Sequence, residues 1–399
     1  MLNVKNIKKN KGVPVGQTHG RYPMTMHIDW LTVVSDYSCK DEKEIFEANM
    51  LLLKKKLKGE YNVTRRNIDT RSEKKSPYEN GLHISECGAG SPKLLSIYTS
   101  PRFKKVGGIS IQIHPQHITG EGMDSLLNKL NAAFDGLLFP ILSRAWITRV
   151  DIALDIYGCK LDDYFWWLSW AKAYEDFCEP YGLPGLQIGK KSALSLNLYE
   201  KIDACDAKIQ GLKQALFHVF DKDHRGKNRY RKERLIDLEK EQYPDLLRAE
   251  FRVQEKKNAT GKYSKAGKVV MLSKLKSMSS PLQRLKVYER ALMSDMFNEW
   301  YKAGRPDTNS SKGLVNLLNR DKGERLGRAA ERIFERREVE LFNANEVWSS
   351  WSACVDAMGE VLAGQTGKSP ASDQNDSQAK VERKTRRLLG DRSRRTRRR

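Results

Sequence analysis

The chain has 399 residues, of which 39% are hydrophobic and 31% charged, enough for one large or two medium domains with buried cores. Its net charge of +22 favours a polyanionic partner, with nucleic acid as the first expectation. The six cysteines are scattered without a CxxC spacing, which argues against a zinc ribbon or a disulfide framework and predicts free thiols.

No signal-peptide-like apolar stretch and no run of about 18 apolar residues is visible, so we expect a cytoplasmic protein of a bacterial host with no membrane partner. Positive charge concentrates at the end of the chain. Residues 380–399 contain eleven Lys and Arg residues against Glu382 and Asp391. Nucleic-acid contacts are therefore expected from the arginines of this tail: Arg392, Arg394, Arg395, Arg397, Arg398 and Arg399.

In chain order, hydrophobic periodicity predicts a strand at 26–34, a helix at 41–59, a polar loop at 60–80, strands at 82–86, 94–99 and 109–114, and a helix at 123–138. The following elements are a strand at 147–156, a helix at 162–178, a hairpin of strands 185–189 and 194–201, and a strand at 246–256. This order predicts an α+β fold, with an antiparallel sheet that has helices packed on one face. No internal repeat of 20–50 residues is visible.

Changes in composition divide the chain into four parts. They are a basic arm at 1–25, a domain of alternating strands and helices at 26–257 that carries a charged helical insertion at 202–245, a helical region at 258–360, and a disordered Arg-rich tail at 361–399.

Three of the predicted strands share one pattern, in which an apolar face is opposed by a face of charged or hydroxyl side chains. The polar-face residues are Arg149, Asp151 and Asp155 in ITRVDIALDI, Tyr199 and Lys201 in LSLNLYEK, and Arg248, Glu250 and Arg252 in LRAEFRVQ. In one sheet these strands would gather three carboxylates, a tyrosine and several cations. That combination suits metal-assisted chemistry on a phosphate, with oxygen ligands that favour Mg²⁺ or Mn²⁺ over zinc.

Each element of this site has a plainer alternative. Asp151 and Asp155 lie about 13 Å apart along a strand, too far to share one ion directly, and both could be exposed residues that pair with Arg248 and Arg252 across the sheet. Tyr199 could be an ordinary tyrosine at a strand end. His114 closes the strand 109–114 on its polar face and is a further candidate metal ligand, although a hydrogen-bonded or exposed histidine is the alternative. No P-loop, dinucleotide fingerprint or HExxH motif occurs, so no cofactor other than a metal is indicated.

The segments ITRVDIALDI, IGKKSALSLNLYEK and LLRAEFRVQEK, in this order, resemble the rolling-circle replication initiators of filamentous phages and related transposons and plasmids. MHIDWLTVV and IQIHPQHITGEGM also resemble the N-terminal segments of that family, so that the resemblance covers about 26–257. It implies a Rep nuclease-like fold with a tyrosine nucleophile at Tyr199 and acidic residues at Asp151, Asp155 and Glu250. The chain lacks the two-histidine metal motif of the better-known nickases, because ISIQIHP contains only His114.

The resemblance implies an enzyme that nicks and rejoins one DNA strand at an origin and leaves a 3′ hydroxyl to prime synthesis. On this interpretation Lys201, Arg248 and Arg252 stabilise the negative charge of the transition state, and Arg149 contacts nucleic acid. The partners would be double-stranded and single-stranded replicon DNA, together with a host helicase and polymerase, and a dimer is one option for the oligomeric state. The alternatives are a non-enzymatic DNA-binding protein, such as a repressor or an iteron-type initiator, and an RNA-binding protein.

Overall fold

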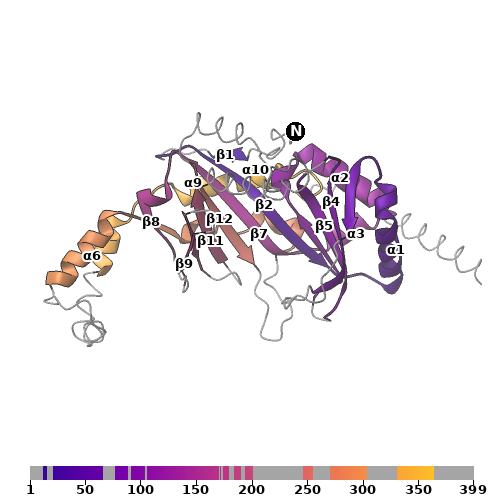
Figure 1. Cartoon of the computed structure of the whole chain (residues 1–399), viewed down its shortest axis with the longest axis horizontal. Coiled ribbons are helices and arrows are strands. Elements are labelled where there is room, and N and C mark those ends of the chain that lie inside the picture. Colours follow the sequence, from indigo (N-terminus) through magenta and orange to yellow (C-terminus); the bar gives the residue numbers. More distant parts are fainter. Residues whose placement is uncertain are drawn as a thin grey trace, which may run out of the picture.

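The computed structural model describes residues 12–15, 21–65, 77–88, 91–103, 106–169, 171, 174–178, 184–189, 194–200, 246–254, 270–302 and 330–363. These residues form an α+β fold built on one large antiparallel sheet with several helices (Figure 1). The insertion at 202–245, the arm before residue 12 and the tail after residue 363 lie outside the described ranges. No helix within those ranges is long and apolar enough to cross a membrane.

The sheet follows the order β3-β4-β5-β6-β2-β7-β12-β11-β10-β9, and its neighbouring strands are antiparallel. The strands are β2 (Met24–Ser35), β3 (Tyr61–Arg65), β4 (Tyr78–Glu86), β5 (Lys93–Pro101), β6 (Ile109–Ile113), β7 (Trp146–Tyr157), β9 (Tyr174–Cys178), β10 (Pro184–Ile188), β11 (Leu194–Glu200) and β12 (Leu246–Gln254). The short β1 (Val13–Pro14) pairs with β2, and β8 (Tyr164–Leu168) pairs with β13 (Leu285–Glu289) in a separate two-stranded sheet.

The large sheet consists of two halves with the same topology, which meet at β2 and β7. Outward from β2 the strands are β6, β5, β4 and β3; outward from β7 they are β12, β11, β10 and β9. Each half places its last strand beside its first, and the two first strands are antiparallel neighbours. This is the arrangement of a duplicated unit with an approximate twofold axis between β2 and β7, although the sequence shows no matching repeat.

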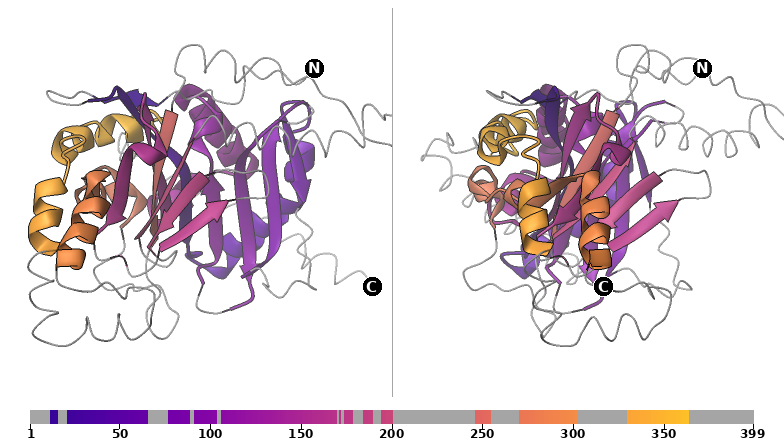
Figure 2. Two further views of the ribbon diagram at one scale, coloured as in Figure 1. Left: turned by 60° about the vertical axis from the view of Figure 1, so that its left-hand side comes forward. Right: turned by 90° about the vertical axis from the view of Figure 1, so that its left-hand side faces the viewer.

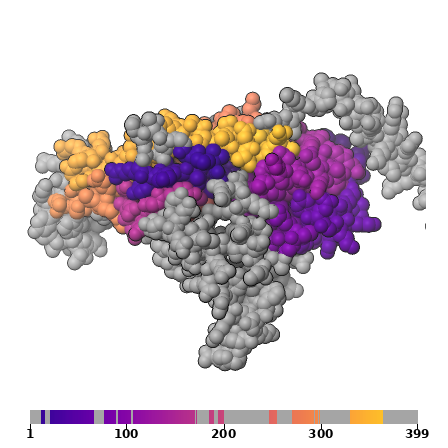
Figure 3. Space-filling model, turned by 90° about the horizontal axis from the view of Figure 1, so that it is seen from above, coloured from indigo at the N-terminus to yellow at the C-terminus, as the bar shows by residue number. Residues whose placement is uncertain are grey.

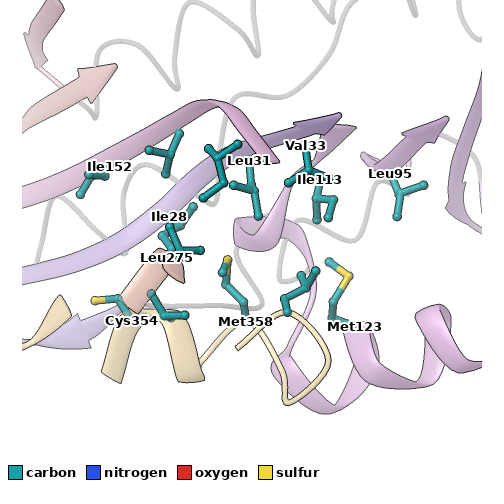
Figure 4. Packing of buried hydrophobic residues seen from close by; sticks show 14 of the residues in the cluster. Ile28, Leu31, Val33, Leu95, Ile113, Met123, Ile152, Leu275, Cys354 and Met358 are labelled. Atoms are coloured by element: carbon teal, nitrogen blue, oxygen red, sulfur yellow. The ribbon is translucent and has the colours of Figure 1, made fainter. Parts of the chain in front are cut away.

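One face of the sheet is apolar and is covered by helices. These are α1 (Lys40–Lys56), α2 (Gly120–Ala133), α3 (Leu138–Ser143), α9 (Ala344–Ser349), α10 (Trp351–Asp356) and the 3₁₀ helix η4 (Leu272–Ser277). Alternation in β2 and helical spacing in α2 place Leu31, Val33, Leu126 and Leu130 in one core, each almost fully buried. Figure 4 shows the strand side chains pointing toward Met123, Leu275, Cys354 and Met358.

The C-terminal segments pack against the same core as the N-terminal ones. The Trp351 indole is buried and its Nε1 donates to the backbone oxygen of Leu275 at 2.9 Å, while Asp124 on α2 accepts from the amides of Glu360 and Val361. Seen from above, the yellow C-terminal segment runs beside β1 to reach the N-terminal half (Figure 3). The described part of 258–360 is therefore an integral part of the fold, and it includes the strand β13.

Three predicted elements differ in the structure. The expected loop at 60–80 contains β3, and the expected helix at 123–138 is shorter, because α2 ends at Ala133 and Gly136 (φ +83°) separates it from α3. The expected helix at 162–178 is instead the two strands β8 and β9. Tyr164, Trp166 and Leu168 are buried while Trp167 is exposed, which is a period of two, and aromatic residues favour such half-buried strands.

The helix α6 (Ala291–Lys302) lies at one end of the molecule, away from α1 (Figure 1). Its Asp295 accepts hydrogen bonds from Arg336 and Arg337, which tie it to the helical segment at 330–337. In the right-hand view of Figure 2 these orange and yellow helices lie on one side of the pink strands of the second half. The polar side chains considered next lie on β2, β7, β11 and β12, on the face of the sheet opposite the apolar one.

Candidate active site

The polar face of β11, β12, β7 and β2 holds a compact cluster of charged side chains. Its register defines three rows: Tyr199–Arg248–Asp155–Thr25, Asn197–Glu250–Ala153–His27 and Ser195–Arg252–Asp151–Trp30. The expected strands 109–114, 147–156, 194–201 and 246–256 thus share one antiparallel sheet. Tyr199, Asp151 and Glu250 lie on the same face of it, as the alternation predicts.

Arg248 is the fully buried centre of the first row. Its Nε and Nη2 donate to the two oxygens of Asp155 at 2.6 and 2.7 Å, and its Nη1 donates to Asp29 at 3.0 Å. Burial lowers the pKa of Arg248, but Asp155 and Asp29 outweigh that effect and raise the pKa well above its ordinary value. Asp29 in turn lies 2.7 Å from Nε2 of His27. Arg248 is therefore a permanent cation that fixes two carboxylates.

Tyr199 and Glu250 form the pair that can exchange a proton. The Tyr199 hydroxyl donates to Oε2 of Glu250 at 3.3 Å. Burial raises the pKa of Tyr199 well above its ordinary value, and the Arg248 guanidinium opposes that rise. Burial also raises the pKa of Glu250, with the negative charges of Asp29 and Asp151 acting in the same direction. A carboxylate with a raised pKa is a better proton acceptor for a phenol than an ordinary glutamate.

Asp151 lies between two arginines at the other end of the cluster. Arg149 Nε donates to it at 2.8 Å, and Arg252 Nε donates to it at 3.3 Å. Arg252 also reaches Oε1 of Glu250 at 3.4 Å, so one guanidinium links Asp151 to Glu250. Both Arg252 contacts are long for charge-assisted hydrogen bonds, and 17% of the Arg252 side chain is exposed to solvent. Arg252 is thus held less firmly than the buried Arg248.

The cluster has more carboxylates than guanidinium groups, and the residue at its middle position on β7 has a small side chain. Within the described residues, the ion pairs of Asp29, Asp151, Asp155 and Glu250 involve three guanidinium groups, Arg149, Arg248 and Arg252, and the His27 ring beside Asp29. Ala153 on β7 lies opposite both Glu250 and His27 in the register, and it has the smallest side chain of the three rows. Buried like charges are unfavourable without a counter-ion, so such a cluster is a candidate functional site.

The remaining predicted residues are placed as follows. Asp151 and Asp155 do pair with Arg252 and Arg248, as the plainer alternative had it, but each is only 1% exposed. His114 contacts the rings of Trp30 and His117, and its buried Nε2 makes no hydrogen bond. Lys201 and the tail arginines Arg392, Arg394, Arg395, Arg397, Arg398 and Arg399 lie outside the described residues.

Sequence reasoning missed His27 and Asp29, which join the cluster from β2. The signal was present, because Met26 and Ile28 alternate with His27 and Asp29 at the start of the predicted strand 26–34. A register shift between Ile28 and Trp30 then interrupts the alternation, so that both Ile28 and Leu31 are buried in the core. Asp29 lies in this irregularity and reaches Arg248 from there.

Comparison with protein-family models and with curated proteins finds no match to this chain.

His114 gives a pH-dependent prediction for stability. Burial, followed by the positive charge of Lys93, lowers the pKa of His114 to about 3. The unfolded chain therefore binds a proton near pH 6.5 that the folded protein does not bind, and stability falls as the pH drops below that value. Between about pH 7.5 and about pH 5 this histidine should cost roughly 2 kcal/mol of unfolding free energy.

The prediction is checked by urea denaturation of the wild type and of His114→Phe at both pH values. Phenylalanine keeps an aromatic edge against Trp30 but does not titrate, so the variant should lose less stability on acidification. An equal loss in both proteins would show that His114 is protonated in the folded state.

Proposed function

We propose that the protein is a DNA nicking and joining enzyme of the rolling-circle initiator type, with Tyr199 as its nucleophile. The observation that carries the proposal is the hydrogen bond from Tyr199 to Glu250, on a sheet face that also holds Asp29, Asp151 and Arg252. The resemblance of these strands to the initiator family and the net charge of +22 both point to DNA as the substrate.

In the proposed reaction the Tyr199 oxygen attacks the scissile phosphorus as Glu250 takes the phenol proton. The bond from phosphorus to the 3′ oxygen breaks, and the proton returns to that oxygen to give a free 3′ hydroxyl. The 5′ phosphate stays on Tyr199 as a phosphotyrosine, and joining is the same sequence in reverse. Arg252 is the cation placed to stabilise the negative charge that develops on the phosphoryl oxygens.

Arg248 receives a different role from the one the sequence predicts. All of its described contacts go to Asp155 and Asp29, and no part of it is exposed. It cannot contact a phosphate without leaving two buried carboxylates unpaired. We therefore assign Arg248 and Asp155 to positioning, since Arg248 holds Asp29 and lies opposite Tyr199 in the register.

The donor chemistry of the cluster suits a hard divalent cation, although no group of three His, Cys, Asp or Glu side chains within the described ranges is already arranged around one point. Asp151 and Glu250 are the two carboxylates that would hold Mg²⁺ or Mn²⁺, because both contact the same cationic group, Arg252. Such an ion would act as a Lewis acid on a phosphoryl oxygen. Asp155 is a poorer ligand, since both of its oxygens accept from Arg248.

The test is nicking of supercoiled DNA from the replicon that encodes the protein, in the presence of Mg²⁺. We expect Glu250→Gln to lower the nicking rate by about 100-fold or more, the contribution typical of a general base, while duplex binding stays near the wild-type level. Glu86→Gln, on β4 in the other half of the sheet, is the matched control and should nick normally. EDTA should stop the reaction, and added Mg²⁺ or Mn²⁺ should restore it.

The outcomes separate the alternatives. Wild-type nicking by Glu250→Gln would remove Glu250 from the mechanism, and nicking that survives EDTA would remove the metal. Origin binding without any nicking or covalent adduct under these conditions would favour the non-enzymatic DNA-binding protein.

A further inference from the structure

Beside the carboxylate cluster, Trp30 lies among cationic side chains on the polar face of β2. The Arg149 guanidinium is 4.4 Å from the centre of the Trp30 ring, and the Lys93 ammonium is 5.4 Å from it. The His114 ring meets the indole edge-on at 4.2 Å, and the indole Nε1 donates to Thr32 at 2.7 Å. The indole is thus held in one orientation by contacts from β2, β5 and β7 and from the residue that follows β6.

The Trp30 ring is not part of the apolar core. Leu31, next in the chain, is fully buried in the core, whereas Trp30 is half-buried on the opposite face. A tryptophan that faces two cations on a polar surface contributes little to core packing, but it is well suited to stacking and cation–π contacts.

Trp30 is also connected to the candidate active site. It lies opposite Asp151 in the β2–β7 register, and Arg149 contacts both the Trp30 ring and the Asp151 carboxylate. From Trp30 to Tyr199 the path crosses three strand spacings and four residues, roughly 20 Å along the sheet face. A short stretch of unpaired nucleotides can span that distance.

We propose that Trp30, Arg149 and Lys93 form a subsite for single-stranded DNA on the same sheet face as Tyr199, a few nucleotides along the strand from the scissile phosphate. An unpaired base extends the stack in which the Arg149 guanidinium lies over the Trp30 indole, and Lys93 pairs with a backbone phosphate. Stacking of this kind accepts any base, so the subsite provides strand affinity rather than sequence recognition. This inference rests on the proposed nicking function, because it names the form of DNA that the active site receives.

The test compares binding of fluorescent single-stranded and duplex DNA by the full-length protein and three variants. Trp30→Ala should weaken single-strand binding by about ten-fold or more, as expected for the loss of one base–aromatic stack, and should change duplex binding much less. Trp30→Phe keeps a stacking ring and should retain most of the affinity. Trp167→Ala, which removes an exposed tryptophan from β8 in the separate sheet, is the matched control and should bind as the wild type does.

A fourth variant examines the cationic part of the subsite. Lys93→Gln should reduce the slope of log affinity against log salt concentration by about 0.7 for single strands. Urea denaturation midpoints of all variants establish that each is folded before its affinity is compared. Equal single-strand affinity for Trp30→Ala and Trp167→Ala would overturn the proposal, as would a Trp30 effect confined to RNA oligonucleotides.

The subsite and the nicking activity can fail separately. If Tyr199→Phe still nicks DNA while Trp30→Ala binds single strands weakly, the subsite stands and the nucleophile is wrong. If Tyr199→Phe is inactive and Trp30→Ala both binds single strands and nicks like the wild type, the subsite is wrong and the nicking function stands.

Discussion

Replacement of Tyr199 by phenylalanine is expected to abolish nicking and covalent capture of DNA together. The change removes the hydroxyl that attacks phosphorus and leaves the ring in place on β11. Stability should change by about 1 kcal/mol or less, because the lost interaction is one 3.3 Å hydrogen bond to Glu250. Origin binding should also persist, since phosphate contacts by cations elsewhere on the protein supply most of the affinity for DNA.

The other half of the sheet offers a matched control for this experiment. Tyr98 on β5 donates to Oε1 of Gln112 on β6 at 3.4 Å, and Gln112 lies two residues along β6 from the register partner of Tyr98. Tyr199 and Glu250 have the same relation on β11 and β12. Tyr98→Phe should therefore lose a similar hydrogen bond and keep full nicking activity.

The adduct itself is measured by incubating the protein with supercoiled replicon DNA and Mg²⁺, digesting it, and mapping the phosphotyrosyl peptide. We expect that peptide to contain Tyr199. Nicking by Tyr199→Phe at the wild-type rate, or an adduct on another tyrosine, would remove Tyr199 from the mechanism.

Strand alternation predicts which residues share a face, but it does not predict which strands are neighbours. Asp151, Tyr199 and Glu250 were expected on the polar face because their periods of two are regular. Their proximity depends on the pairing of β11 with β12, which are separated in the sequence by residues 201–245, and on the pairing of β12 with β7. Long-range pairing of this kind is not contained in local hydrophobic pattern.

The sequence pattern also does not predict that the polar face is buried. Asp151 and Asp155 read equally well as exposed strand residues, yet both are 1% exposed and Arg248 is fully buried. The clearest error concerns aromatic residues, because the sequence pattern predicts a helix that includes YFWWL, which the structure shows to be the strand β8. Its period of two becomes evident only when the buried Tyr164 and Trp166 are distinguished from the exposed Trp167.

The two halves of the sheet show why a shared topology does not give two sites. By strand order and register, Ser110, Gln112 and His114 occupy the places in the first half that Arg248, Glu250 and Arg252 occupy in the second. Within the described residues, the first half therefore lacks the arginine and carboxylate that set the environment of Tyr199. The chemistry of a site depends on the side chains that its strands carry and not on the order of the strands.

Arg248→Met is expected to destabilise the protein by about 3–5 kcal/mol, the cost typical of breaking a buried ion pair by removing one partner. Methionine fills much of the space but provides no hydrogen-bond donors, so Asp155 and Asp29 are left as buried carboxylates without their shared counter-ion. Arg248→Lys should lose less, although one ammonium cannot reproduce the two parallel bonds to Asp155. The measurement is the free energy of urea unfolding near neutral pH.

The control and the double variant identify the cause of the loss. Arg252→Met removes a cation from the same strand that is partly exposed and makes only long contacts, so it should cost clearly less than Arg248→Met. Adding Asp155→Leu to Arg248→Met removes one of the unpaired carboxylates, and the double variant should be more stable than Arg248→Met alone. If the second substitution instead lowers stability further, and by the same amount as it does in the wild-type background, Arg248 and Asp155 are not coupled. The destabilisation would then come from lost packing, and the positioning role that we assign to Arg248 would have no energetic basis.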